Sequence, residues 1–452
     1  MLAALQIGPE TGSRVRFVGD ERWPSCFPVT ELAAASIGAA ACALSELVAI
    51  DRPAPNVTVD RRLASLWFFW SIDPIGWELP SPWDAIAGDY ETADGWIKLH
   101  TNAPHHRAAA LTVLGPATTR DEVARAVRSH HGESLEQAIV EAAGCAALLR
   151  TTDDWRAHPQ GGAVAAEPLV IWDREVATDR SIGTASIEHP LHGVRVLDLT
   201  RVIAGPVATR LLAGFGAEVL RIDPPTWDEP GVVPEVTLGK RCAQLDLHDD
   251  ADRTVFERLL ADADVVVHGY RSDALERLGY GTDARQAIRP GIIDVSLDAY
   301  GHTGPWAQRR GFDSLVQFST GIAAAGMAWQ ASDHPVSLPV QALDHATGYL
   351  VAAAVTRSIA SVRRDGVAPC ARLSLARTAH ALIEHRDEPT DATMSPLTEA
   401  DYQPTTEPTS WGAARRLRPP VEVAGTPLHW SRPARALGSS VPAWESTTSR
   451  SV

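Results

Sequence analysis

The stretch VRVLDLTRVIAGPVATRLLAGFGAEVLRI, residues 194–222, decides the fold. Its two ends, 194–199 and 218–222, are nearly continuous runs of apolar residues, and the segment from Ala204 to Phe215 has the pattern of a helix. Strands buried on both faces lack the alternation of half-exposed strands, and a helix commonly joins two parallel strands. The stretch therefore predicts a strand–helix–strand unit of a parallel sheet.

The same alternation continues downstream. Further strands are predicted at 264–268 and 291–297, and further helices at 251–262 and 275–278. This order predicts an α/β fold with a Rossmann-like parallel sheet covered by helices. The first turn of the sheet reads AGP and not GxGxxG, so a nicotinamide or flavin dinucleotide site of the usual kind is disfavoured.

The upstream half of the chain has a different pattern. Residues 27–49 predict a buried, Ala-rich helix, residues 95–101 predict a short strand, and residues 106–150 look helical. Residues 173–189 are polar and predict a linker to the parallel sheet. The upstream half is therefore expected to fold as a smaller α+β domain.

Composition narrows the possible functions. The length of 452 residues suggests two or three domains. A net charge of −15 argues against general nucleic-acid binding but still allows a local basic pocket. No apolar run reaches about 18 residues, so no membrane span is expected, and the first residues lack a signal-peptide pattern. Five scattered cysteines without CxxC argue against a disulfide framework or a zinc site and favour the cytoplasm.

The segment LPVQALDHATGY, residues 338–349, places one acid, Asp344, between an apolar run and a small-residue helix pattern. An Asp at this point suits a helix N-cap, because its carboxylate can accept a hydrogen bond from a free backbone N–H. It could also be a nucleophile, since a helix start is open to substrate and favours negative charge. On this residue alone the cap is the simpler interpretation.

Two parts of the chain also resemble each other weakly. FPVTELAAASIGAAACAL, residues 27–44, is similar to LPVQALDHATGYLVAAAV, residues 338–355, and residues 57–67 are similar to 371–383. A repeat of this kind predicts two copies of one structural unit.

The alignment of the two copies determines which residue of the first copy corresponds to Asp344. If Pro28 lies over Pro339, Ala33 or Ala34 occupies the position of Asp344. We therefore expect one catalytic carboxylate in each chain.

Three consecutive blocks, residues 192–225, 238–281 and 289–321, resemble class III CoA-transferases, the formyl-CoA and carnitine CoA-transferase family. The segment around Asp344 resembles the catalytic motif of that family, in which an Asp is followed four residues later by Gly. The resemblance is ordered and continuous over residues 190–383. It implies the Rossmann-like large domain of the family.

The resemblance also implies three segments. Residues 1–185 resemble the smaller domain of the family and carry the degenerate repeat, residues 186–385 form the large catalytic domain, and residues 386–452 form a loop and a C-terminal return segment. The small domain normally follows the catalytic region, so its order here is expected to be rearranged. Family members form intertwined homodimers, which implies a homodimer here as well.

The chemistry implied by the resemblance is transfer of CoA. Asp344 would attack the thioester carbonyl of an acyl-CoA, and an aspartyl-CoA thioester would then pass CoA to an acceptor carboxylic acid. A carboxylate is a weak nucleophile and needs desolvation, orientation and stabilisation of the oxyanion. Coenzyme A enters as part of the substrate, and no metal is implied.

The residues implied to contact CoA come from the matching motifs, and their cationic side chains suit its phosphates. They are Arg201, Val202, Ile203, Ala204, Lys240, Arg241, Gly269, Tyr270, Arg271 and Arg277. Two positions depart from the family pattern. Ile203 stands where a polar residue, commonly Gln, is frequent, and Pro224 stands where some members have Arg.

Two alternatives remain open. Racemases of the same fold use a His in a Gly-His-Asp segment, which here reads GFD at 311–313, and Phe312 cannot transfer a proton. A CoA-ester racemase or isomerase would therefore need His345 or His302 as a substitute. The second alternative is a non-catalytic CoA-binding member. Asp313 itself is expected to cap the helix that starts at 314.

Overall fold

The computed structural model describes residues 1–452 except 180, 184–185, 271–273, 387–392 and 446–452. The largest sheet in this part of the chain has the strand order β10-β9-β8-β11-β12-β13-β7. Its strands are β7 (Ile171–Ala177), β8 (Arg195–Leu199), β9 (Glu218–Asp223), β10 (Arg241–Gln244), β11 (Val265–His268), β12 (Ile293–Asp298) and β13 (Val367–Ser374). All neighbours in it are parallel except β13 and β7. The predicted parallel α/β sheet is confirmed.

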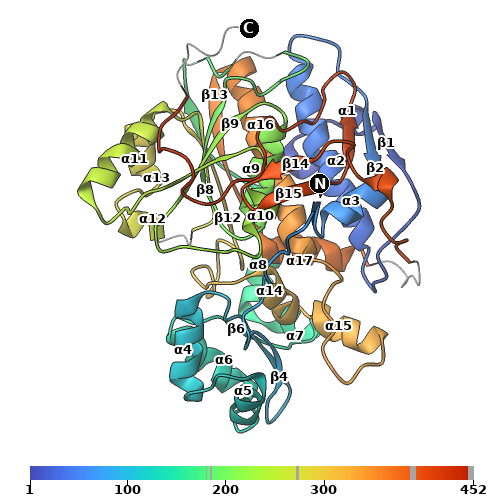
Figure 1. Ribbon diagram of the computed structural model, residues 1–452, viewed down its shortest axis with the longest axis vertical. Helices are drawn as coiled ribbons and strands as arrows, with labels where there is room; N and C mark the ends of the chain where they lie inside the picture. The colour runs from blue at the N-terminus through green and yellow to red at the C-terminus, as the bar shows by residue number, and fades with distance from the viewer. Residues whose placement is uncertain (180, 184–185, 271–273, 387–392, 446–452) are drawn as a thin grey trace.

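Helices cover both faces of this sheet (Figure 1). One layer contains α9 (Ala204–Gly214) and α16 (Ala342–Asp365), and the other contains α11 (Asp250–Asp262), α12 (Ala274–Arg277) and α13 (Thr282–Ile288). Successive strand residues point to opposite faces, so Val196 joins the core beneath α9 and α16, whereas Leu197 joins the core beneath α11. This double burial explains why the strands are continuously apolar.

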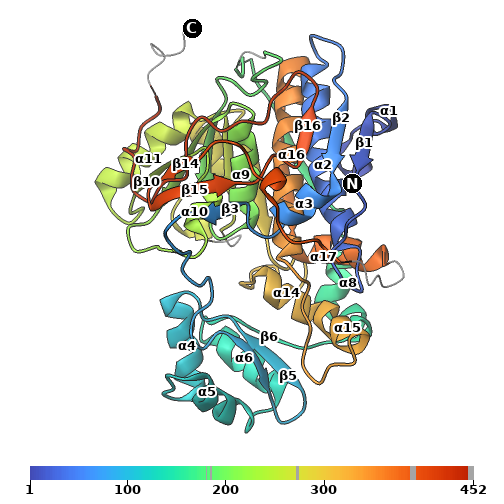
Figure 2. The ribbon, with the colours of Figure 1, turned by 45° about the vertical axis from the view of Figure 1, so that its right-hand side comes forward.

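The smaller α+β domain is also confirmed, and it precedes the large sheet in the chain. It has an antiparallel sheet of β4 (Gly88–Glu91), β5 (Trp96–Leu99) and β6 (Ala146–Leu148). Helices α4 (Pro104–Leu114), α5 (Arg120–Val127) and α6 (Gly132–Glu141) enclose a separate apolar core with it. Figure 2 shows this domain below the large sheet, next to α14 (Asp313–Ser319) and α15 (Ile322–Trp329).

The predicted linker at 173–189 is wrong at its start. Residues 171–177 form β7, which pairs antiparallel with β13 at the edge of the large sheet. An edge strand can carry many polar residues because one side of it faces solvent, so its composition did not reveal it. The sequence segment 1–185 therefore contributes a strand to the sheet of segment 186–385.

The loop predicted within residues 386–452 is also partly wrong. It contains η2 (Glu399–Asp401), β14 (Glu407–Thr409), β15 (Gly412–Arg416) and β16 (Val421–Val423). Strand β15 pairs with β3 (Ile72–Pro74), and β16 pairs with β2 (Val57–Asp60). The three segments inferred from the sequence are thus interleaved through shared sheets and are not separate units.

The internal repeat is present in the structure. Helix α2 (Val29–Val48), β2 and α3 (Arg61–Trp67) correspond to α16, β13 and α17 (Leu375–Glu384). Strand β2 pairs parallel with β1 (Val15–Val18) and antiparallel with β16, as β13 does with β12 and β7. The two long helices pack against each other.

The register of the repeat differs from the predicted one. Pro28 precedes α2 with φ −75° and ψ 65°, and Gln341 precedes α16 with φ −76° and ψ 64°. Each residue is the centre of an inverse γ-turn, closed by a 2.8 Å hydrogen bond from the residue after it to the residue before it. Pro28 therefore corresponds to Gln341 and not to Pro339.

This register places Glu31, rather than Ala33 or Ala34, at the position equivalent to Asp344. Glu31 pairs with Arg22 at 3.1 Å, and its side chain is partly exposed. The N-terminal copy of the repeat therefore also has an acid at the third residue of its helix, but this acid is ion-paired with Arg22.

Helix α2 has the length and apolarity of a membrane span, unlike any other helix in the described residues. The predicted absence of such a span rested on the lack of an uninterrupted apolar run, which Glu31 and Glu46 break near the two ends. In the structure, 83% of the apolar window is buried inside the molecule, where α16 and α3 pack against the helix. A buried core helix of this kind passes the same length and composition test.

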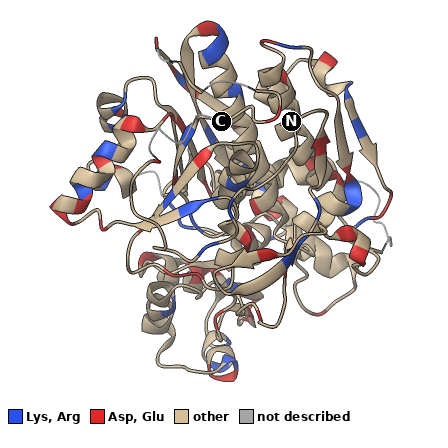
Figure 3. Cartoon of the chain, turned by 45° about the horizontal axis from the view of Figure 1, so that its top comes forward, with Lys and Arg blue, Asp and Glu red and all other residues tan. Residues whose placement is uncertain are grey.

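The remaining described elements connect these layers. They are η1 (Ala3–Leu5), α1 (Pro9–Gly12), α7 (Thr152–Ala157), α8 (Pro159–Ala166) and α10 (Val233–Val236). Figure 3 shows Lys and Arg interspersed with Asp and Glu over helices and loops of the molecule. The acidic excess is therefore spread along the chain and is not gathered in one segment.

Candidate active site

Asp344 is the third residue of α16 and is only 7% exposed. The N-cap of this helix is Gln341, and no side chain makes a cap hydrogen bond there. The cap interpretation of Asp344 is therefore wrong. Its carboxylate lies near the positive end of the helix dipole, and among the described residues no donor is hydrogen-bonded to it.

Two cavities meet at Asp344. The first, which we call the aromatic cavity, has a volume of about 450 Å³ and is walled by Phe68, Phe69, Trp70, Trp83, Trp227 and Phe312. The second, which we call the basic cavity, has a volume of about 290 Å³ and is lined by Arg201, Arg309 and Arg310. Both are also lined by Val202 and Asp344, so the carboxyl is accessible from either side.

A second carboxyl lies beside the first. The backbone N–H of Asp344 donates to Asp313 Oδ2 at 2.9 Å. Burial and, secondarily, the charge of Asp313 raise the pKa of Asp344 well above its ordinary value. Burial likewise raises the pKa of Asp313 to about 6, although hydrogen bonds from the Asp344 amide and from Gln317 oppose the shift. Two close buried carboxyls disfavour double ionisation, so the pair retains a proton to higher pH than isolated acids do.

Asp313 holds the start of α16 in place. The predicted cap for the helix from 314 is wrong, because Phe312 is the N-cap of α14 and the Asp313 carboxylate faces α16 instead. Gln317 Nε2 donates to Asp313 Oδ1, and Gln317 Oε1 accepts from the Leu338 amide at 2.7 Å. These bonds connect α14 to both ends of the segment that leads into Asp344.

The turn before α9 is strained at Val202. This β-branched residue has a φ of 64°, a conformation that L-residues with branched side chains rarely adopt. Its amide donates to Glu229 Oε2 at 3.0 Å, and Glu229 pairs with the buried Arg221 at 2.6 Å. Arg221 also pairs with Asp223 at 2.8 Å. A buried network therefore fixes an unfavourable backbone conformation at the junction of the two cavities, which is typical of functional sites.

The structure brings together six of the ten residues implied to contact CoA. Arg201, Val202, Ala204, Gly269 and Tyr270 line the basic cavity, whereas Ile203 lines the aromatic cavity. Arg201 donates to the Tyr270 hydroxyl at 2.9 Å, and its guanidinium lies 4.4 Å from the centre of the Trp227 ring.

Three others do not line either cavity. Lys240 is fully buried, where its Nζ lies 2.9 Å from both Asp198 Oδ2 and the Pro206 carbonyl. Arg241 donates to carbonyls of the C-terminal segment, including that of Val441 at 3.2 Å. Arg277 ends α12. The positions of Lys240 and Arg241 depend on pairing with distant segments, which a basic motif does not reveal. Arg271 lies outside the described residues.

The site also contains residues that the sequence did not indicate. His100, after β5, lines the aromatic cavity and stacks on Phe312 at 3.7 Å between ring centres. His106, in α4, lines the basic cavity, and both of its ring nitrogens are buried without a hydrogen-bond partner. Burial is the main reason that the pKa of each imidazole falls to about 3. The adjacent pair His105-His106 was a visible signal, but nothing in the pattern placed it beside Asp344.

The histidines considered as proton carriers for a racemase lie differently. His345 is buried, stacks on Phe68 at 5.2 Å, and has a pKa lowered well below its ordinary value by burial. His302 lies 3.3 Å from Asp298 and 3.0 Å from the Leu373 carbonyl and lines neither of the two cavities. The position of the racemase His remains filled by Phe312.

Comparisons with known proteins agree on one family. The model of CoA-transferase family III matches residues 191–438, more than half of the chain. An acyl-CoA transferase of Gibberella moniliformis is 30% identical over 293 residues, which are 58% of this chain and 50% of that protein. The human succinyl-CoA:glutarate CoA-transferase is 33% identical over 190 residues, 39% of this chain and 43% of that protein.

A solved structure is similar over a comparable part. The crystal structure of Rv3272 from Mycobacterium tuberculosis matches with a TM-score of 0.41 and 32% identity, over 43% of this chain and 57% of that chain. The chain spans about half the length of the curated relatives it matches. On the match of the family model, the chain belongs to CoA-transferase family III.

Proposed function

We propose that this chain is an acyl-CoA transferase, which moves CoA from an acyl-CoA thioester to an acceptor carboxylic acid, with Asp344 as the nucleophile. The observation that carries the proposal is the position of Asp344 at the start of α16, buried and yet shared by two cavities. Such a carboxyl can meet a thioester whose CoA and acyl parts extend in opposite directions.

The reaction needs no group beyond the two substrates and this carboxylate. An Asp344 oxygen attacks the thioester carbon, the C–S bond breaks, and CoA leaves as a thiolate while a mixed anhydride forms. The thiolate then attacks the aspartyl carbonyl, which releases the donor acid and leaves an aspartyl-CoA thioester. The acceptor carboxylate repeats the two steps in reverse order, which yields the new acyl-CoA and restores Asp344.

The surroundings of Asp344 suit this chemistry. Aromatic walls keep water from the anhydride and the thioester, both of which water would hydrolyse. A buried carboxylate with a raised pKa is poorly solvated and hence more nucleophilic once it has lost its proton. The unpartnered nitrogens of His106 are available to a polar group of the CoA ester on the basic side.

The family membership supports this proposal, and so do the names of the similar proteins, an acyl-CoA transferase and a succinyl-CoA:glutarate CoA-transferase. The carry-over of activity to this chain is our inference, because only about half of those proteins is covered.

Trapping the covalent intermediate tests the proposal. The purified chain is incubated with a panel of acyl-CoAs and examined by intact-protein and peptide mass spectrometry. We expect a CoA adduct on the peptide that contains Asp344, and its conversion to a hydroxamate by hydroxylamine. Asp344→Asn should retain binding of the CoA ester but lose the adduct and at least about a thousandfold in turnover, since a nucleophile is removed. Full turnover by this variant would overturn the assignment.

A further inference from the structure

We propose that the aromatic cavity holds the acyl group and selects an uncharged, bulky or aromatic monocarboxylic acid over a dicarboxylic acid. This inference rests on the function proposed above and specifies its substrate class.

The two cavities differ in charge, which orients the thioester. The basic cavity is lined by Arg201 and Arg310, whose guanidinium groups suit the phosphates of CoA. Arg309 also lines it but pairs with the buried Glu136 at 2.9 Å. The aromatic cavity, on the other side of Asp344, has no Lys or Arg among the described residues that line it. A thioester carbon placed at Asp344 with CoA in the basic cavity therefore directs its acyl group into the aromatic cavity.

The described residues that line the aromatic cavity offer no counterion for a second carboxylate. The titratable side chains with nitrogen that line it are His100 and His345, and burial keeps the imidazole of each neutral by lowering its pKa. Its remaining titratable walls are acidic and include Asp84, Asp228 and Glu229. Asp84 pairs with Arg107 and Glu229 pairs with Arg221. A carboxylate at the far end of an acyl chain would therefore lose its water without gaining a cation among the described lining residues, which is unfavourable.

Shape and hydrogen bonding favour a flat or bulky apolar group. Rings of Phe68, Trp83 and Trp227 line a space of about 450 Å³, within the usual range for small-molecule sites. Aromatic walls bind rings by offset stacking and edge contacts. The unpartnered buried polar atoms on this wall are uncharged: Ser314 Oγ, Trp227 Nε1 and the Nδ1 atoms of His100 and His345. They suit a carbonyl or hydroxyl group of a neutral acyl chain.

The test measures exchange of each acid with its own CoA ester, so that one acyl group is examined at a time. Phenylacetyl-, 3-phenylpropionyl- and benzoyl-CoA are compared with succinyl- and glutaryl-CoA, each incubated with its ¹³C-labelled free acid. We expect kcat/KM for the best aromatic ester to exceed that of both dicarboxylic esters at least tenfold.

A substitution of Phe69 can test whether the preference for aromatic over dicarboxylic acyl groups is reversible. It lines the aromatic cavity and is 53% exposed, so a long polar side chain there can reach solvent. Phe69→Arg should raise kcat/KM for glutaryl-CoA relative to 3-phenylpropionyl-CoA at least tenfold by supplying a cation. Phe69→Leu, the matched control, should weaken aromatic exchange without improving glutaryl exchange.

The outcomes separate the two proposals. Faster exchange of succinyl or glutaryl groups by the unaltered chain, with an adduct on Asp344, would overturn the acyl preference and leave the transferase assignment standing. Absence of exchange and of adduct with every ester in the panel would overturn the transferase assignment and this inference with it.

Discussion

At the scale of single residues, the charge of Asp313 adds to burial in raising the pKa of Asp344. Asp313→Asn removes this charge, so the pKa of Asp344 should fall and the acid limb of the kcat/KM profile should move to lower pH. Turnover should also fall roughly tenfold, because the side-chain NH2 of the new Asn must face either the Asp344 amide or Gln317 Nε2, and both of these groups are donors.

A pH–rate profile of CoA exchange between pH 5 and 9 measures this change. Asp84→Asn serves as the control, because Asp84 lines the aromatic cavity, as Asp313 and Asp344 do, but pairs with Arg107 at 2.9 Å. An acid limb that does not move in Asp313→Asn would contradict the coupling.

The ionised carboxylate of Asp344 should also lower the stability of the folded chain. The pKa of Asp344 is raised in the folded state, so the folded state holds the proton more tightly than the unfolded chain does. Stability is then lost as pH rises from the unfolded pKa through the folded pKa. Asp344→Asn should therefore raise Tm at pH 8 and have little effect near pH 4. Thermal unfolding at both pH values, with the exposed acid variant Asp20→Asn as control, checks the sign.

Single residues also show how far the sequence could be used. Sequence motifs were enough to find Asp344, Arg201 and Tyr270, because each of these residues lies within a short continuous segment that reaches the site. The prediction that Lys240 contacts CoA failed because its ammonium group is fully buried against Asp198. A sequence does not distinguish such a lysine from one that faces a phosphate. His106 was missed because the small domain brings it to the site from a distant part of the chain.

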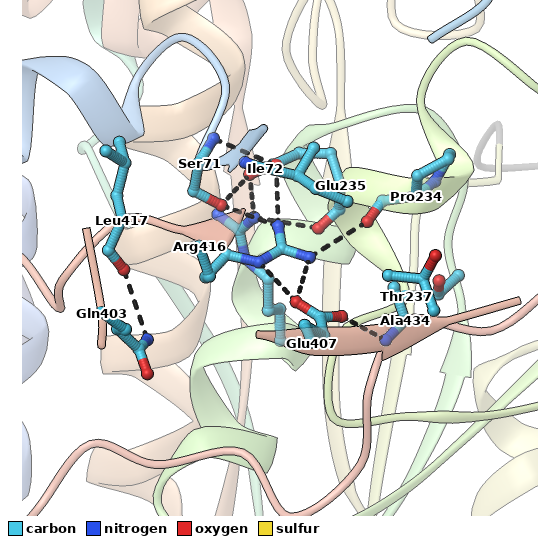
Figure 4. A network of polar contacts seen from close by, with 12 residues as sticks. Ser71, Ile72, Pro234, Glu235, Thr237, Gln403, Glu407, Arg416, Leu417 and Ala434 are labelled. Carbon is cyan, nitrogen blue, oxygen red and sulfur yellow. Dashed lines mark hydrogen bonds and ion pairs between the residues drawn. The ribbon is translucent and has the colours of Figure 1, made fainter. Parts of the chain in front are cut away.

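At the scale of elements, one buried charge network joins three parts of the chain (Figure 4). Glu235 in α10 accepts from the Ser71 hydroxyl at 2.7 Å and pairs with Arg416 of β15 at 3.0 Å. Arg210 of α9 pairs with the same carboxylate, and Glu407 pairs with Arg416 at 2.9 Å. The carboxylate of Glu235 thus connects the N-terminal, catalytic and C-terminal segments through buried polar contacts.

Removal of one partner should be costly because charges would remain buried. Arg416→Ala is expected to lower the free energy of unfolding by about 3–5 kcal/mol. Arg415→Ala, on the same strand, breaks half-exposed pairs with Asp73 and Glu399 and should cost about 1 kcal/mol or less. Urea denaturation of the two variants compares them, and equal losses would contradict the role of the network.

The strands that the sequence missed lie at sheet edges or are short. Strands β8, β9, β11 and β12 are covered on both faces, so their apolar runs predicted them. Strand β7 lies at a sheet edge, β14 and β15 are short and contain several polar residues, and β16 has only three residues, of which Val421 and Val423 are buried. Backbone pairing, not side-chain burial, defines such strands, and composition carries little trace of it.

At the scale of the whole molecule, the paired helices α2 and α16 bring the two copies of the repeat face to face within one chain. The small domain of the same chain already contributes His100 and His106 to the site. The inferred homodimer is thus not required to complete the described cavities. Gel filtration with light scattering would determine the assembly state.

The two copies should differ in chemistry. Glu31 stands at the position of Asp344 but pairs with Arg22, so one CoA adduct per chain is expected at saturation. Glu31→Gln should leave both the adduct and the exchange rate within about twofold of the unaltered chain. Intact-mass spectrometry counts the adducts, and a second adduct that Glu31→Gln abolishes would show that both copies react.

The pairing of α2 with α16 also has a consequence for synthesis on the ribosome. Helix α2 is made near the start of the chain, and its partner begins at residue 342, about 300 residues later. At roughly 5–20 residues per second, the wait lasts about 15–60 s. During that time the face of α2 that α16 will cover has emerged without its partner. Nascent chains stalled before residue 342 should therefore bind a holding chaperone through α2, and chains released after α17 should not.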